Sequence, residues 1–231
     1  MIFGIIMLGV VTTMIRNRLA ELLSERGLKI TKVAKDTGIS RNTITSTSQN
    51  DSKMIQYETI DVLCQYLGVT PKEFFQYNPM RVVSTIESGT LTLDVKVIDF
   101  LNSPVLTDLK YHFDFFVDIS DRGKEFDYSL SGEVSFLSDS RTLKTFLTFD
   151  DKEEISSFNQ NIDKLEIGFI VEIEKEIETK IKESFRTELK RYIETEIREV
   201  YRKDLTDSIN SLKWTFDTDY DVQNIWMIRP V

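Results

Sequence analysis

The sequence has one cysteine and one histidine, Cys64 and His112. This scarcity excludes small domains stabilised by disulfides or by a structural zinc ion. A single cysteine cannot form an internal disulfide, and this pair is too few to complete the ligand set of a structural zinc site. Cys64 lies in an apolar helical pattern, which favours a buried, unreactive thiol. We therefore expect no metal site and no cofactor.

The sequence also lacks a hydrophobic run long enough to cross a membrane. Its most apolar segment is residues 1–13, whereas a membrane-spanning helix needs about 20 residues. This N-terminal extension has neither a basic start nor a clear cleavage site, so it does not resemble a secretory signal. The favoured interpretation is an over-called start codon, with translation beginning at Met7 or Met14 instead of Met1. A disordered extension comes next and a membrane anchor last, so we expect a cytoplasmic protein without a membrane partner.

Negative charge is concentrated in the C-terminal two thirds of the chain. The whole chain has a formal charge of −9, but residues 14–80 hold nine Lys/Arg against seven Asp/Glu and are net +2. Residues 81–231 hold 20 Lys/Arg against 31 Asp/Glu and are net −11. Such asymmetry indicates two domains with different partners. We place them at 14–78 and 79–231.

Five short helices are predicted in the first domain. Ile15, Leu19, Leu22 and Leu23 mark one face of the first helix, which Gly27 ends. A second helix spans about 30–37, and Gly38 makes the turn that follows it. Ser40 caps a third helix, which runs to about Ser48. The fourth spans 57–67. Thr70-Pro71 starts the fifth with a capping residue followed by proline, and Phe74 and Phe75 are its expected core residues.

Two segments of this domain carry a family resemblance. Residues 31–44, TKVAKDTGISRNTI, combine a small Ala34 at the expected helix crossing with Gly38 four residues later and apolar Ile39 and Ile44. This run resembles the helix-turn-helix of the Cro/CI (Xre-like) repressor family, and residues 60–71 resemble the fourth and fifth helices of those domains. The resemblance covers less than a third of the chain. It implies an all-α domain whose third helix reads double-stranded DNA.

The outward side of the third helix provides the candidate DNA-reading residues. A recognition helix lies in the major groove, and side chains near its N-terminus reach base edges. Because Ile44 must face the core, the outward positions are those expected to read bases: Arg41, Asn42, Thr45 and Ser46. Candidates for phosphate contact are Thr31, Lys32, Thr43, Asn50, Ser52 and Lys53. A net charge of only +2 predicts weak non-specific binding, so we expect a homodimer.

The second domain is predicted to be α+β, because the hydrophobic period changes from 3.6 to 2 after Pro79. Alternating apolar residues predict an antiparallel meander with strands at 91–97, 109–119, 126–136 and 143–149. Residues 152 to about 211 read as one long or kinked helix, although a strand at 165–173 is an alternative. Apolar residues alternate again at Trp214, Phe216, Tyr220 and Val222, which predicts a last strand that returns to the sheet. The chain ends with further apolar residues at Ile225, Trp226, Met227 and Ile228.

The predicted long helix has an unusual spacing. Its apolar residues recur every four positions from Ile173 to Ile197. In a helix of about 3.6 residues per turn, this spacing drifts by about 40° per step. The helix must therefore wrap, kink or contact more than one surface. It is not a heptad coiled coil, although helix pairing between two subunits stays open.

No catalytic motif is evident in the second domain, and we expect no enzymatic activity. His112 lies on the polar face of a strand, where a solvated histidine is the expected role. Two functions remain open. The first is a dimeric transcriptional regulator, a bacterial repressor of phage or mobile-element type, in which the second domain dimerises or senses a ligand. The second is a fusion in which residues 81–231 bind and inhibit a basic protein, as in anti-CRISPR-like proteins, while the first domain controls its own gene.

Overall fold

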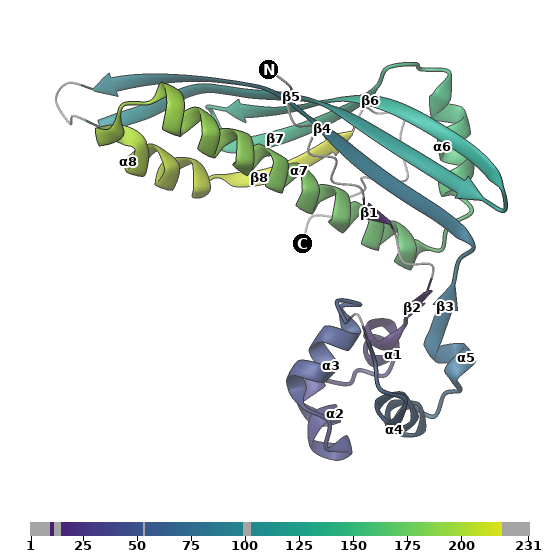
Figure 1. The fold of residues 1–231 in the computed structure, drawn as a ribbon. Helices are drawn as coiled ribbons and strands as arrows, with labels where there is room; N and C mark the ends of the chain where they lie inside the picture. The colour runs from purple at the N-terminus through teal and green to yellow at the C-terminus, as the bar shows by residue number, and fades with distance from the viewer. Residues whose placement is uncertain (1–9, 12–14, 53, 99–102, 219–231) are drawn as a thin grey trace. The chain divides into compact units, whose positions relative to one another are not determined.

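The computed structural model describes residues 10–11, 15–52, 54–98 and 103–218, which divide into two compact units (Figure 1). The helical unit comprises residues 15–79, and the sheet unit comprises residues 10–11 and 80–218. Each unit has its own hydrophobic core. Among the described residues, no helix is both long and apolar enough to cross a membrane.

The helical unit contains the five expected short helices. They are α1 (Leu19–Glu25), α2 (Ile30–Thr37), α3 (Arg41–Ser48), α4 (Tyr57–Leu67) and α5 (Pro71–Phe74). Their core is formed by Leu19, Leu22, Leu23, Val33, Ile44, Leu63, Cys64, Leu67 and Phe74, all at most 6% exposed. Burial raises the pKa of the Cys64 thiol, as expected for an unreactive cysteine.

Turn and capping residues explain where these helices begin and end. Gly38 ends α2 with a left-handed φ of 77°, a conformation in which a side chain would be strained. The Ser40 hydroxyl then accepts a hydrogen bond from the backbone N–H of Thr43 and caps α3. Thr70 and Glu73 form a reciprocal capping box at α5. The capping predictions at Ser40 and Thr70 are confirmed.

The prediction that Ile15 begins the first helix is wrong. Ile15 belongs to a short strand, β2 (Ile15–Asn17), which pairs antiparallel with β3 (Phe75–Tyr77), and its side chain is 60% exposed. The partner strand lies about 60 residues away in sequence, so local periodicity could not reveal it. Phe75, expected in the core, lies in β3 and is only half-buried, with its ring edge-on to the buried Phe74.

The sheet unit is built on a six-stranded, strongly curled sheet in the order β1-β4-β5-β6-β7-β8 (Figure 1). Its strands are β1 (Val10–Val11), β4 (Met80–Ile98), β5 (Ser103–Asp121), β6 (Lys124–Leu137), β7 (Thr142–Phe149) and β8 (Lys213–Thr218). The meander β4-β5-β6-β7 is antiparallel, as predicted, but β8 runs parallel to β7. The prediction of an antiparallel sheet is therefore wrong at this edge, because three helices connect β7 to β8.

The segment predicted as one helix forms three helices. They are α6 (Glu154–Ile162), α7 (Ile167–Glu196) and α8 (Glu199–Asn210). The alternative of a strand at 165–173 is wrong, since α7 begins at Ile167 and buries Phe169, Ile170 and Ile173. The predicted strand at Trp214 and Phe216 is found as β8, whereas the predicted continuation from Tyr220 to Ile228 lies outside the described residues.

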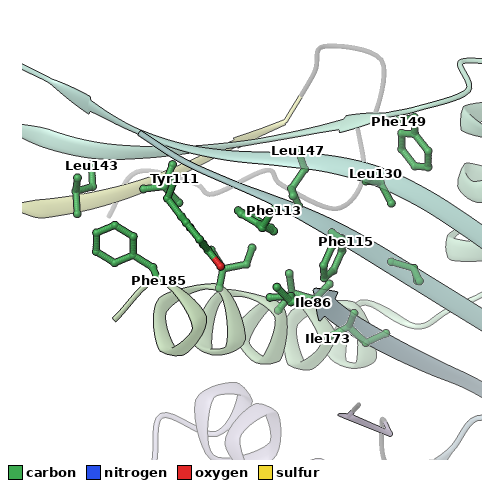
Figure 2. Close-up of a cluster of buried hydrophobic side chains, with 14 of the residues drawn as sticks. Ile86, Tyr111, Phe113, Phe115, Leu130, Leu143, Leu147, Phe149, Ile173 and Phe185 are labelled. Carbon is green, nitrogen blue, oxygen red and sulfur yellow. The ribbon is translucent and has the colours of Figure 1, made fainter. Parts of the chain in front are cut away.

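The four-residue spacing in α7 is explained by contact with more than one surface. Ile173, Ile177, Ile181, Phe185, Leu189 and Ile193 are all at most 6% exposed and belong to one core with the sheet. Figure 2 shows Ile173 and Phe185 at two points along this core, facing residues of the strands. Because the apolar stripe drifts around the helix, its first half contacts the curled sheet, and its last turns also pack against α8.

Buried polar groups also join α7 to the sheet. The Tyr111 hydroxyl of β5 lies 2.7 Å from Ser184 Oγ. The Lys180 ammonium donates hydrogen bonds to the backbone carbonyl and the hydroxyl of Ser84 in β4. Burial lowers the pKa of Lys180 to about 8. Hydrogen bonding at both sites allows these polar groups to be buried within an otherwise apolar layer.

The helical unit is inserted between two paired strands of the sheet unit. β1 precedes it, β4 follows it, and the two pair antiparallel with Val10 opposite Ser84 and Val11 opposite Val83. The rest of the N-terminal extension, residues 1–9 and 12–13, lies outside the described residues. The hypothesis of a start at Met7 or Met14 stays a prediction, and a chain begun at Met14 would lack β1.

Candidate nucleic-acid interface

The outward side of α3 carries the four residues expected to read bases. Successive residues of a helix are rotated by about 100°. This rotation places Asn42, Thr45 and Ser46 on the side opposite Ile44 and Thr47, which are 0% and 1% exposed, and places Arg41 at the edge of that side, about 60° from Ile44. Arg41 and Asn42 are exposed, whereas Thr45 and Ser46 are half-buried. The geometry therefore favours the N-terminal end of α3 as the part that can approach a base edge.

The side chains of Arg41 and Asn42 make no hydrogen bond or ion pair with the part of the chain that the structure describes. An arginine can bond guanine with two parallel donors, and an asparagine can bond adenine in the same bidentate way. Either side chain can therefore turn toward a ligand without breaking an internal contact.

Hydrogen bonds within the chain already occupy several of the other hydroxyl groups around α3. The Ser46 hydroxyl donates to the Thr43 carbonyl and accepts from Ser52 Oγ, with both distances 3.1 Å. Thr43 Oγ1 lies 2.8 Å from Ser40 Oγ at the helix N-terminus. The fold thus brings the base-reading candidate Ser46 together with the phosphate candidate Ser52. A hydroxyl has one donor and two acceptor lone pairs, so Ser46 retains one acceptor position for a donor group on a base.

Lys32 and Thr31 lie in the first turn of α2 and are exposed. Lys32 Nζ donates to Asp36 at 2.9 Å, and the Tyr66 hydroxyl donates to the same carboxylate at 2.7 Å. The hydrogen bond to Asp36 raises the pKa of Lys32, so this lysine is a cation at neutral pH. An ammonium has three donors, so Lys32 can contact a phosphate while it remains paired with Asp36.

Asn50 has a structural contact that the sequence did not indicate. It adopts a left-handed φ of 54°, and its side-chain amide pairs with the backbone of Asn17 at 2.8 and 3.1 Å. The Asn17 side chain in turn donates to Asn50 Oδ1 and to the Thr47 carbonyl. This asparagine pair fixes the C-terminal end of α3 to β2. The remaining phosphate candidate, Lys53, lies outside the described residues.

Lys29 is an interface candidate that sequence reasoning missed. It immediately precedes α2, its side chain is exposed, and it has no bonded partner within the described residues. The first amides of a helix point outward and carry partial positive charge, which favours a phosphate. The available signal was a basic residue directly before the predicted second helix.

His112 and the metal-ligating residue types are the remaining titratable groups considered from the sequence. Within the described ranges, no group of three or more His, Cys, Asp or Glu side chains could hold a metal ion. His112 is 56% exposed, and its Nδ1 lies 3.4 Å from a carboxylate oxygen of Glu133. A surface contact of this kind is ordinary for a solvated histidine.

Comparison with known proteins bears on the helical unit. Residues 18–80 match the family of Cro/C1-type HTH DNA-binding domains. Neither the curated proteins nor the solved structures contain a match to the chain. The matched range covers all five helices of the helical unit and the candidate reading face of α3. Residues 18–80 are therefore a helix-turn-helix DNA-binding domain of the Cro/C1 type.

Proposed function

We propose that this chain is a sequence-specific transcriptional repressor of phage or mobile-element type, acting in a bacterium as a dimer. The observation that carries the proposal is the outward face of α3, where Arg41 and Asn42 are exposed and have no internal partner. Helix formation alone does not explain the residues of α3, since Asn, Thr and Ser are mediocre helix formers. Short hydrogen-bonding side chains suit close approach to base edges.

Dimerisation follows from the small positive charge of the domain. Residues 14–80 are net +2, and each phosphate neutralised adds to affinity through counterion release. One copy therefore binds DNA weakly, whereas two linked copies on adjacent half-sites gain affinity from a high effective concentration. We assign the dimer contact to the sheet unit.

Footprinting on the DNA upstream of the gene tests this function. We expect the full chain to protect a two-fold symmetric site, and residues 14–80 alone to bind it at least tenfold more weakly, because the truncated chain lacks the dimerising unit. Equal protection by both would contradict the assigned role of the sheet unit. No protected site with either protein would contradict the regulator itself.

A second candidate function is supported by the charge on the outer face of the sheet. Carboxylates project from this face on β4, β5 and β6, and we call five of them the acidic face: Glu87, Asp114, Asp118, Glu125 and Asp127. Asp118 lies directly opposite Asp127, an arrangement that destabilises a sheet. Desolvation, followed by repulsion from Asp127 and Glu125, raises the pKa of Asp118. Because the fold gains nothing from this pairing, binding of a basic protein that normally contacts nucleic acid is the alternative role.

Salt dependence and charge removal test this alternative. In a pull-down from host lysate with the full chain, a basic protein should be retained at about 0.05 M salt and lost at about 0.3 M, where charges are screened over a shorter distance. Asp118→Asn with Asp127→Asn should weaken capture. Asp204→Asn with Glu196→Gln, two exposed acids on the helices, should not. Capture that resists salt, or that both variants retain equally, would contradict the acidic-face role.

A further inference from the structure

A groove of about 830 Å³ lies between the C-terminal half of α7 and the length of α8. The two helices follow one another with only two residues between them and lie side by side (Figure 1). Leu189 and Ile193 line the groove from α7, while Thr206 and Asn210 line it from α8. A volume of several hundred Å³ with an apolar floor and a few charged groups is typical of small-molecule sites.

Positive side chains from both helices meet in this groove. Arg186 and Lys190 come from α7, one turn apart, and Arg202 and Lys203 come from α8. Their position is notable because residues 81–231 are net −11, so a concentration of cations is not a consequence of overall composition. In water these long side chains can also contribute their apolar stems to the walls of a site.

Two of these cations are available for a ligand. Arg186 and Lys203 have no hydrogen bond or ion pair with the described part of the chain. Arg202 is different, because its Nε donates to the Ile197 carbonyl at 2.9 Å and closes the connection between the two helices. Lys190 lies 4.0 Å from Glu194, a loose surface pair. Arg186 and Lys203 therefore provide charge that the fold itself does not use.

Acidic side chains restrict the kind of anion that fits. Glu194, Glu199 and Asp207 also line the groove, so a ligand that is only a dense negative charge would be repelled by them. Carboxylates accept hydrogen bonds from hydroxyl and amino groups. Arginine and lysine bind phosphate oxygens, arginine often with two parallel bonds. A ligand with phosphates at one end and hydroxyl and amino groups at the other satisfies both sets.

We propose that the groove between α7 and α8 binds a nucleoside di- or triphosphate. Arg186 and Lys203 contact its phosphates, and the groove carboxylates accept hydrogen bonds from its sugar hydroxyls and base amino groups. Binding itself is independent of DNA recognition. Its use as an effector signal rests on the proposed regulatory function.

Binding of ADP and ATP to the full chain, measured by titration calorimetry without DNA, tests the proposal. We expect Arg186→Glu with Lys203→Glu to weaken ADP binding at least tenfold, because two unpaired cations become anions. The matched control is Lys96→Glu with Lys110→Glu. These two exposed strand lysines lie outside the groove, have no bonded partner among the described residues, and give the same change in net charge. The control should bind ADP like the parent chain.

Competition by fragments of the ligand distinguishes a nucleotide site from a simple anion site. Inorganic pyrophosphate and adenosine should each displace ADP, but each at a concentration at least tenfold higher than ADP itself requires. Pyrophosphate that binds as tightly as ADP would overturn the nucleotide assignment. Absence of ADP and ATP binding, or equal loss in the control variant, would overturn the site. Since the assay contains no DNA, a negative result leaves the footprint of the upstream site as a separate test of the proposed function.

Discussion

Arg41→Ala combined with Asn42→Ala is expected to abolish selective protection of the operator while leaving the helical unit folded. Each specific base contact contributes about 1–3 kcal/mol of discrimination. In the proposed dimer, two residues in each of two subunits would account for at least about 4 kcal/mol, which is roughly a thousandfold in affinity. The fold should tolerate the change, because neither side chain has a partner among the described residues and alanine favours helix.

Gel-shift titration on the operator and on a scrambled site of equal length measures this effect. The expected result is loss of preference for the operator, with weak binding to both DNAs remaining. Lys72→Ala with Ser24→Ala is a matched control, since it removes one positive charge and one hydroxyl from exposed positions on α5 and α1. That control should retain operator preference. If the Arg41/Asn42 variant binds the operator with parental affinity and preference, α3 does not read the bases through these residues.

Asn17→Ala is expected to destabilise the helical unit by about 3 kcal/mol. Asn17 is 3% exposed, and its side chain donates to the Thr47 carbonyl at 2.7 Å while accepting from the Leu19 amide at 3.0 Å. Alanine leaves the Leu19 amide without its partner, whereas the Thr47 carbonyl still accepts from the Asn50 backbone amide at 3.0 Å. A buried donor left unsatisfied costs about 1–3 kcal/mol. The substitution also removes one half of the pair with Asn50. Because domains are stable by only about 5–15 kcal/mol, the end of α3 should lose its fixed position.

The distribution of tryptophan allows this loss to be assigned to one unit. The chain has two tryptophans, Trp214 and Trp226, and neither belongs to residues 15–79. In urea titration of the full-length variant, part of the loss of far-ultraviolet circular dichroism should therefore occur at lower urea than in the parent chain. The transition followed by tryptophan fluorescence should keep the parental midpoint. Asn42→Ala is the matched control for the loss of an amide and should shift neither signal. Coincident transitions in Asn17→Ala and the parent chain would show that the asparagine pair is not a stabilising contact.

The sequence was most informative where structure is determined by neighbouring residues. α3 and α4 begin and end where Ser40, Gly38 and the apolar spacing indicated, and the capping box at Thr70 is present. These features depend on hydrogen bonds within a few residues, so a linear reading can identify them. The outward position of Arg41 and Asn42 follows from the same local argument, because burial of Ile44 fixes the opposite face.

The predictions that failed involve partners far apart in the sequence. Local periodicity places Ile15 in a helix, yet it pairs with Tyr77 in a strand. The same periodicity predicts an antiparallel sheet, yet β8 lies parallel to β7. Asn50 was considered only for phosphate contact because its pairing with Asn17 spans 33 residues. No local pattern encodes which distant segment will be adjacent.

Three features could be read from the residues alone: the Cro/C1-type domain, the strands of the meander, and the separation of a slightly basic part from a strongly acidic part. Residue type and local spacing are sufficient for these, since they set helix caps, hydrophobic period and charge. Three further features required the three-dimensional fold. The strands that precede and follow the helical unit in sequence, β1 and β4, pair with each other, carboxylates of three strands share one face, and cations of α7 and α8 line one groove. These arrangements depend on which apolar surfaces are buried together, and that burial is a property of the whole fold.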